Sequence, residues 1–318
     1  MSFPLTQEQQ LIEAIARCTG SDSLGDDAFY DPQSRLIYTT DMLVEGRHFD
    51  WRWFSPADLG WKAAAVNFSD VAAMGGQALY LLVSLALPED KANAGFVSAL
   101  YEGLSACCKT YGARIVGGDT VSGPATVISV TAVGFLPQGH TPGLRKAARA
   151  GDYVITTGFH GLSAAGLEVL CHSKPGFEMA RQRHLHPLPR MAEGLLLSKT
   201  FERYALIDSS DGLADALLRL AGASGVDIRV EADALPVYPE VAALENPRQA
   251  ILYGGEDFEL VAAVPGVTDE ITRQFSVIGR VLPQSGVEPL VLLTQADGSV
   301  EHLRFDGVYQ HFGGETHV

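Results

Sequence analysis

The sequence predicts an α/β protein with two domains, and three observations support this fold class. Helical and strand periods alternate along most of the chain, as they do in packed layers of helices and sheets. Of the 318 residues, 47% are hydrophobic and 19% are charged, so the chain can bury a core for about two domains. A stretch rich in proline, glycine and basic residues, 137–149, interrupts the pattern and places the boundary between domains 1–139 and 140–318.

The first domain is expected to alternate helices and strands around one long helix. Ser55, Pro56 and Asp58 signal the start of that helix with an N-cap, a first-turn proline and a first-turn acid, and Gly75 and Gly76 end it. The pattern predicts helices over 7–17, 55–74 and 91–111, and strands over 35–40, 79–87, 114–116 and 126–135.

The second domain continues the alternation. The pattern predicts helices over 163–170 and 212–223, and strands over 153–156, 205–207, 226–230, 258–264 and 275–281. The glycine loop 158–161 precedes a helix but matches no dinucleotide or P-loop motif, so alone it favours a plain strand-to-helix turn. Residues 181–187 are typical of a polar connector.

The composition excludes several classes of protein. With 23 Lys and Arg against 38 Asp and Glu, the formal charge of −15 disfavours nucleic acid or an anionic membrane as the main partner. The four cysteines show no paired spacing and are expected to be buried in a protein of a reducing compartment. The N-terminus lacks the features of a signal peptide, and the longest apolar run, 78–87, is too short to span a membrane. We therefore expect a cytoplasmic protein.

The acidic residues gather in short clusters beside glycine, serine or threonine. These clusters are 25–27, 39–41, 67–70, 117–120, 208–212 and 254–257. Carboxylate, hydroxyl and carbonyl oxygens are the ligands that Mg²⁺ prefers, and glycine lets a phosphate approach the backbone. Each cluster taken alone also fits a solvated turn or a helix cap. Together they favour a site for metal ions and phosphate.

Asp70 is the most informative single acid. It falls on the apolar stripe of the long helix with Leu59, Ala63, Val66 and Met74, and a carboxylate there must be paired, hydrogen-bonded or bound to a cation. Taken alone, Asp70 is interpreted as a buried aspartate that caps a neighbouring loop. The other acidic clusters instead favour a role for Asp70 as a ligand of a cation.

Other side chains carry weaker signals. Arg145 suits a phosphate, although an exposed basic linker is the more usual explanation. His48 follows an acidic cluster and can face a ligand there, and Tyr309 can stack on a ring, but a structural role is the usual one for each. The sequence contains no HExxH or GxSxG motif and no Cys/His pair, which argues against metalloprotease or acyl-transfer chemistry.

Taken in order, the clusters resemble the thiamine-monophosphate kinase family, within the superfamily of aminoimidazole ribonucleotide synthetase and selenophosphate synthetase. The resemblance covers about residue 25 to residue 309. It rests on six segments that stand in the family's order and spacing: GDD at 25–27, TD at 40–41 with HF at 48–49, VNFSDVAAMG at 66–75, GGDT at 117–120, DSSDGL at 208–213 and GGEDFEL at 254–260. Ser209 departs from the family, where an apolar residue is more usual.

The resemblance implies ATP-dependent and Mg²⁺-dependent phosphorylation of thiamine monophosphate to thiamine diphosphate. It also implies the two-domain aminoimidazole ribonucleotide synthetase-like fold and a homodimer that pairs its N-terminal sheets. The metal and ATP-phosphate site would belong to the first domain, and further nucleotide and substrate contacts to the second. By motif match, the metal ligands would be Asp27, Thr39, Thr40, Asp41, Asp70, Asp119, Asp208 and Asp211. Gly118, Asp119, Arg145 and Ser210 would contact ATP, and His48, Glu256 and Tyr309 would contact thiamine monophosphate.

Phosphoryl transfer to a phosphate needs alignment and charge neutralisation more than a general base, so we expect direct transfer with no assigned catalytic base. Two alternatives stay open. One is another ATP-dependent enzyme of the same superfamily, although no glycine-rich segment surrounds Cys18 and the chain does not end in cysteine. The other is a divalent-cation-binding protein without catalytic activity.

Overall fold

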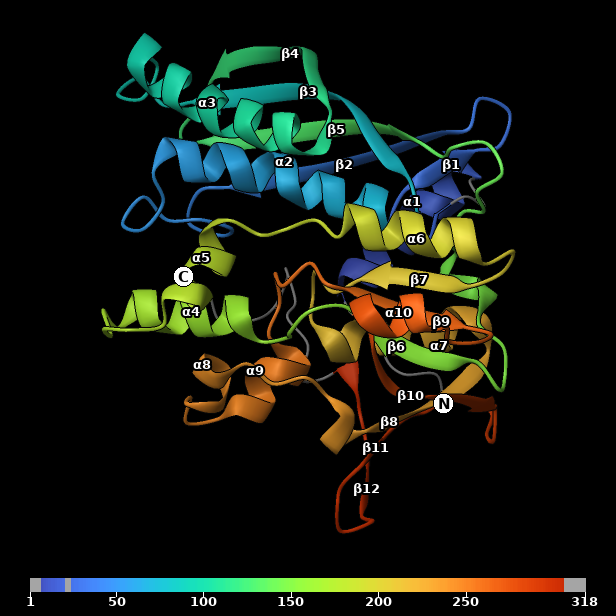
Figure 1. Cartoon of the computed structure of the whole chain (residues 1–318). Coiled ribbons are helices and arrows are strands. Elements are labelled where there is room, and N and C mark those ends of the chain that lie inside the picture. The colour runs from blue at the N-terminus through green and yellow to red at the C-terminus, as the bar shows by residue number, and fades with distance from the viewer. Residues whose placement is uncertain (1–6, 21–23, 306–318) are drawn as a thin grey trace.

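The computed structural model describes residues 7–20 and 24–305, and it contains two sheets with helices packed around them (Figure 1). The five-stranded sheet has the order β1-β2-β5-β3-β4, and the seven-stranded sheet has the order β12-β11-β8-β10-β6-β9-β7. The first sheet uses residues between 29 and 135 and the second uses residues between 153 and 302. The mixed α/β fold class predicted from the periodicity is confirmed.

The first half of the chain forms the five-stranded sheet and three helices. Its strands are β1 (Phe29–Asp31), β2 (Leu36–Val44), β3 (Gln77–Leu87), β4 (Arg114–Ser122) and β5 (Val127–Phe135). Its helices are α1 (Gln7–Thr19), α2 (Pro56–Ala73) and α3 (Ala94–Tyr111).

Up to residue 305, the second half adds seven strands and seven α-helices. The strands are β6 (Tyr153–Thr156), β7 (Ala205–Asp208), β8 (Val226–Glu231), β9 (Leu260–Val264), β10 (Ser276–Pro283), β11 (Val291–Thr294) and β12 (Val300–His302). The helices are α4 (Leu162–Cys171), α5 (Glu178–Leu185), α6 (Met191–Thr200), α7 (Leu213–Ser224), α8 (Pro239–Ala242), α9 (Pro247–Tyr253) and α10 (Asp269–Gln274).

Helix α2 lies between the two halves of the molecule. It packs on β2 and β5 on one side and contacts α6 and β7 on the other (Figure 1). Thirteen of its eighteen residues are buried, as expected for a helix that is covered on nearly all sides. A polar side chain on α2 is therefore held between the two sheets, where few water molecules can screen it.

The five-stranded sheet has one covered face and one open face. Along β2, Ile37 and Leu43 are buried towards α2, whereas Tyr38 and Met42 point to the other side and are 38% and 54% exposed. Leu82 on β3 continues this exposed row, because β3 alternates in the same register. The open face thus carries large apolar side chains in solvent.

Several local predictions were wrong. β4 extends to Ser122, beyond its predicted end. The eight residues of α5 form a helix where a connector was expected. The elements that were not predicted are α6, α8, α9, α10, β1, β11 and β12. Cys107 and Cys108 are buried as expected, but Cys18 and Cys171 are exposed. Among the helices of the described residues, none combines the length and the apolar character needed to cross a membrane.

Candidate active site

Helix α2 carries the central carboxylate of the site, and its start is fixed by local chemistry. Ser55 Oγ accepts the backbone N–H of Asp58, and the Asp58 carboxylate accepts the backbone N–H of Ser55, which forms a capping box ahead of Pro56. The helix then runs without interruption to Ala73. Asp70 consequently lies in its last turn, next to Thr39 of β2 and to Asp208 at the end of β7.

Asp27, Asp70 and Asp208 form a cluster of three carboxylates. One oxygen of each lies within 4.8 Å of the chosen oxygens of the other two. Asp27 comes from the loop before β1, Asp70 from α2, and Asp208 from the end of β7. The fold therefore brings together acids that are far apart in the sequence.

Neighbouring side chains hold the cluster in place. Thr39 Oγ1 of β2 donates to Asp70, and Ser69 Oγ of α2 donates to Asp208 at 2.5 Å, so β2 and α2 each supply one hydroxyl donor to the cluster. Arg145 forms an ion pair with Asp27 at 2.7 Å. These contacts orient the carboxylates but supply only one full positive charge for three acids.

The electrostatics of the cluster follow from this shortage of positive charge. Burial, followed by the negative charges of Asp41, Asp208 and Asp27, raises the pKa of Asp70 well above its usual range. Burial, then the charge of Asp27, raises the pKa of Asp208 to about 7. Hard oxygen ligands this close together, and short of positive charge, fit a divalent cation such as Mg²⁺.

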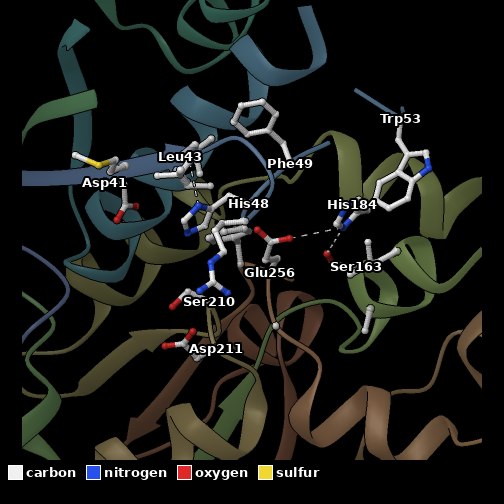
Figure 2. A pocket seen from close by; sticks show the side chains of 18 of the residues that line it. Asp41, Leu43, His48, Phe49, Trp53, Ser163, His184, Ser210, Asp211 and Glu256 are labelled. Carbon is white, nitrogen blue, oxygen red and sulfur yellow. Dashed lines mark hydrogen bonds and ion pairs between the residues drawn. The ribbon is translucent and has the colours of Figure 1, made fainter. Parts of the chain in front are cut away.

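A cavity of about 600 Å³ opens beside the cluster. Its polar lining includes His48, Ser210, Asp211 and Glu256, and Asp41 of β2. In Figure 2, Asp41, Ser210 and Asp211 lie to the left of Glu256, whereas Trp53, Ser163 and His184 lie to its right. The apolar part of the lining is contributed by Leu43, Val44, Phe49, Trp53, Val66, Ala164, Leu167 and Phe258. One end of the cavity is thus acidic and hydroxylic, and the other is largely aromatic and aliphatic.

Two loops present the polar groups in the middle of this cavity. His48 lies in the loop after β2, where its Nδ1 accepts the backbone N–H of Val44 at 3.0 Å, a contact that fixes the orientation of the ring. Glu256 lies between α9 and β9 with a φ of +65°, a left-handed conformation that is costly for glutamate. Its backbone N–H donates to Ser210 O at 2.6 Å. The strain at Glu256 is therefore held by the surrounding contacts.

A second cavity, of about 530 Å³, lies on the Asp27 side of the cluster. Its lining includes Asp26, which accepts the backbone N–H of Arg145 at 2.8 Å, together with Arg145 and Lys146. The rest of the lining is mainly apolar and aromatic: Leu24, Ala28, Phe29, Tyr30, Pro32, Met74, Pro142, Leu144 and Ala223. The cavity therefore combines two cations with aromatic and aliphatic walls, which is suited to a phosphorylated compound with a flat ring.

The structure brings most of the sequence-predicted residues to these two cavities and the cluster. Asp27, Thr39, Asp70 and Asp208 belong to the cluster or contact it, and Arg145 joins the cluster to the second cavity. Asp41, His48, Ser210, Asp211 and Glu256 line the first cavity. Asp211 also lies 3.7 Å from Arg219.

Three predicted residues lie elsewhere in the single chain. Successive side chains of a strand point to opposite faces, so Thr40 points to the open face, away from Thr39 and Asp41. Its hydroxyl donates to Val130 O at 3.1 Å. Gly118 and Asp119 lie on β4, three strands from β2 in the sheet, which corresponds to about 14 Å at the usual strand spacing. Tyr309 lies outside the described residues.

Sequence reasoning missed several residues of the site. Ser69 was included in the cluster 67–70 without a role of its own, and His184 was interpreted as part of a polar connector. Lys62 was not considered, yet its Nζ lies 2.8 Å from the Glu256 carboxylate. A signal was present for Lys62, because residues 62, 66 and 70 recur at intervals of four and so share one helix face. No sequence signal identifies His184, because α5 was itself not predicted.

Comparison with known proteins gives a consistent result. Residues 25–136 match the model of the family described as AIR synthase related protein, N-terminal domain. Thiamine-monophosphate kinase of Synechococcus elongatus is 37% identical over 320 residues, which cover 96% of each chain. Thiamine-monophosphate kinase of Bacillus subtilis is 40% identical over 262 residues, covering 79% of this chain and 80% of the relative. A solved structure described as AaThiL complexed with AMPPCP and TMP superposes with a TM-score of 0.81 at 34% identity, covering 94% of this chain and 96% of that chain.

Proposed function

The chain belongs to the thiamine-monophosphate kinase family of phosphotransferases, and we propose that it transfers the γ-phosphoryl group of ATP to thiamine monophosphate, with Mg²⁺, to give thiamine diphosphate and ADP. The observation that carries the proposal is the position of the carboxylate cluster. Asp41, Ser210 and Asp211 near it line one cavity, and Asp26 and Arg145 line the other. Two phosphorylated compounds, one in each cavity, would present their phosphates to the same cluster.

Thiamine monophosphate would occupy the larger cavity. Its two rings suit the wall that contains Phe49, Trp53 and Phe258, and its polar ring atoms would meet His48 and Glu256. Its phosphate would point towards the acidic end. The match to AaThiL, which is described as complexed with AMPPCP and TMP, supports this choice of substrates. We retain Tyr309 as a further contact on the resemblance alone.

ATP would occupy the second cavity with its phosphates near Arg145. The Arg145 guanidinium is already held by Asp27 at 2.7 Å, so it is oriented before the nucleotide binds and loses little freedom on binding. The aromatic and aliphatic walls suit a nucleobase. Ser210, at the acidic end of the other cavity, would contact the terminal phosphates from the opposite side.

The residues proposed to hold Mg²⁺ are Asp27, Thr39, Asp41, Asp70, Asp208 and Asp211. The close spacing of Asp27, Asp70 and Asp208 supports this set. Burial first, and then the charge of the neighbouring acids, raises the pKa values of Asp70 and Asp208, as expected for carboxylates that lack a compensating cation. Mg²⁺ bound there would offset the charge of the phosphates and polarise the phosphoryl group. The hydroxyls of Thr39 and Ser69 would keep the Asp70 and Asp208 oxygens turned towards the cation.

The proposed reaction is a direct, in-line transfer. The attacking atom is a phosphate oxygen of thiamine monophosphate, which is already ionised near neutral pH, so no side chain has to remove a proton. The chain's own contribution is to fix the two phosphates end to end and to surround them with oriented groups. A ping-pong kinetic pattern or a phosphorylated side chain trapped during turnover would contradict direct transfer.

We further propose that Thr40, Gly118 and Asp119 act across a homodimer. β1 pairs only with residues 36–38 of β2, so within the described residues the outer edge of β2 is unpaired beyond Tyr38, and the outer edge of β4 is unpaired as well. A second copy that pairs its β4 with this free edge of β2 would close both edges. Asp119 of the partner subunit would then lie next to Thr40 and Asp41, and the open apolar face would be covered.

The assay that tests the proposed function measures products. The protein is incubated with ATP, MgCl₂ and thiamine monophosphate, and ADP and thiamine diphosphate are separated by chromatography. We expect equal amounts of both products, none when thiamine replaces thiamine monophosphate as the acceptor, and a loss of at least about 100-fold for Asp70→Asn. Absence of thiamine diphosphate at high enzyme concentration would reject the proposal, and nucleotide turnover with a different acceptor would favour another enzyme of the superfamily.

A further inference from the structure

Lys62 is a charged side chain with no exposure to solvent. Its exposed fraction is 0%, and it lies on α2 behind the wall of the larger cavity. Its Nζ lies 2.8 Å from Glu256 Oε1 and donates to the backbone oxygen of His48 at 3.0 Å. The Phe54 ring covers it at 5.2 Å. One buried cation thus connects the two loops that carry His48 and Glu256.

The surroundings of Lys62 explain why it is retained. An isolated buried ammonium group costs several kcal/mol, so Lys62 is stable only while its oxygen partners stay within reach. Burial alone would raise the pKa of Glu256, but the charge and the hydrogen bond of Lys62, together with the neighbouring histidines, lower it below its usual value. Burial, then the charge of Lys62, lowers the pKa of His184 to about 4, so this ring is neutral. Glu256 is therefore an ionised carboxylate with a fixed partner.

Lys62 also lies at a defined distance from the carboxylate cluster. Lys62, Val66 and Asp70 share one face of α2 at intervals of four residues, and Val66 between them lines the cavity. Eight residues of α-helix span about 12 Å. The same rigid helix therefore holds the Glu256 end and the cluster end of the cavity.

We propose that Lys62 is a positioning residue for the acceptor: it holds Glu256 and the His48 loop at a set distance from the cluster, so that the rings bind where the phosphate reaches the reacting end. The inference rests on the proposed function. It predicts that Lys62 supports binding of the acceptor and has little influence on binding of ATP, because ATP would bind on the other side of the cluster.

The test compares steady-state kinetics of the full-length protein with Lys62→Met, Glu256→Gln and the double variant. Lys62→Met should raise the KM for thiamine monophosphate about tenfold, the usual effect of disturbing one charged contact, and change the KM for ATP less than about twofold. In the Glu256→Gln background, Lys62→Met should raise that KM by less than about threefold, because most of its effect passes through Glu256.

Arg203→Met is the matched control for a loss of stability. Arg203 pairs with the buried Asp152 at 2.6 Å, so this variant also leaves a buried carboxylate without its cation. Neither residue lines either of the two cavities of the site. It should lower the thermal midpoint without moving either KM. If Lys62→Met does not fold, the comparison of Glu256→Gln with wild type still tests the proposal. An unchanged KM for thiamine monophosphate in Glu256→Gln would exclude any action of Lys62 through Glu256.

Other outcomes overturn the inference. Equal changes of both KM values in Lys62→Met, or additive effects in the double variant, would show that Lys62 is merely structural while the proposed function stands. If wild-type protein neither binds nor phosphorylates thiamine monophosphate, the proposed function fails first and the inference falls with it.

Discussion

At the scale of a single residue, Asp208 shows how the fold buries a carboxylate beside other carboxylates, where its ionised form is unfavourable. It is 2% exposed, it accepts a hydrogen bond from Ser69, and it lies beside Asp27 and Asp70. The hydrogen bonds from Ser69 Oγ and from the Ser210 N–H, together with a shared arginine, do not offset burial and like charge, so the carboxyl holds its proton more tightly in the folded chain than in the unfolded chain. A cation in the cluster would remove this penalty.

Asp208→Asn therefore changes how the stability of the metal-free protein depends on pH. A carboxyl whose pKa rises from 3.8 to about 7 on folding favours the folded state fully below pH 3.8, and this contribution is lost as the pH rises to about 7. Wild type should lose up to about 1.4 kcal/mol of unfolding free energy per pH unit relative to Asp208→Asn in this window. Urea unfolding in EDTA between pH 4.5 and 7.5 measures the difference.

Asp297→Asn is the control for that measurement, because Asp297 is an exposed acid in the second half whose pKa is lowered by Ser299. A parallel pH dependence of wild type and Asp208→Asn would contradict the electrostatic account of the cluster. Addition of MgCl₂ at pH 7 should stabilise wild type and leave Asp208→Asn less affected.

At the scale of elements, α2 and α3 approach each other through two glycines. A Cβ at Gly60 would lie 2.0 Å from Leu100 O, and a Cβ at Gly103 would lie 1.9 Å from Ala57 O. Neither position has room for a methyl group unless the helices separate. Because α2 carries both Lys62 and Asp70, the packing of α2 against α3 determines the positions of both side chains in the site.

Gly103→Ala should destabilise the protein by about 1–3 kcal/mol, since an extra methyl group in a packed contact forces the backbones apart. Gly222→Ala is the matched control. It lies in α7 with nothing within 4 Å of the added Cβ, so it should stabilise by about 0.4–1 kcal/mol. Urea unfolding measures both values. A neutral Gly103→Ala would mean that the helices are less closely packed than described.

The elements also show what could be predicted from the sequence. α2 was predicted almost to the residue, because its capping box and terminal glycines are local signals. β4 was predicted to end at Val116 because its two glycines suggested a turn, yet Gly118 lies within the strand, where a Cβ would meet Val83 O at 1.8 Å. α5 and α6 start without a side-chain N-cap bond, so only tertiary packing marks them as helices.

The candidate site, too, has a part that could be predicted from the sequence and a part that could not. Its acids could be predicted because hard oxygen ligands beside glycine are recognisable in sequence, and six motifs in order resemble one family. The direction in which each side chain points could not be predicted. Thr39, Thr40 and Asp41 are consecutive, and only the register of β2 shows that Thr40 points away from the cluster. Lys62 was missed because its partners, His48 and Glu256, are distant in the chain.

At the scale of the whole molecule, the open sheet face and its free edges are the surfaces that the proposed homodimer would bury. Val121 of β4 is 53% exposed and pairs in register with Ala86, on the same face as Leu82. Val121→Glu should give a monomer in sedimentation equilibrium, and kinase activity should fall at least about tenfold because Asp119 of the partner subunit is withdrawn.

Val287→Glu is the matched control for this prediction, since Val287 is 94% exposed in the second half of the chain, remote from the open face. It should leave mass and activity unchanged. A wild-type protein with the mass of one chain and full activity would refute the dimer. Mixing inactive Asp70→Asn and Asp119→Asn proteins should restore about a quarter of wild-type activity, because half of the mixed dimers' sites are complete.

The central claim is that two phosphates meet at the Asp27, Asp70 and Asp208 cluster, one from each cavity. The most direct measurement is a crystal structure of the protein with Mn²⁺, a non-hydrolysable ATP analogue and thiamine monophosphate, with the metal located by anomalous scattering. We predict metal bound to these three carboxylates, the acceptor rings beside His48 and Glu256, and the nucleotide beside Arg145. Metal or thiamine monophosphate bound elsewhere, with the cluster empty, would contradict the account.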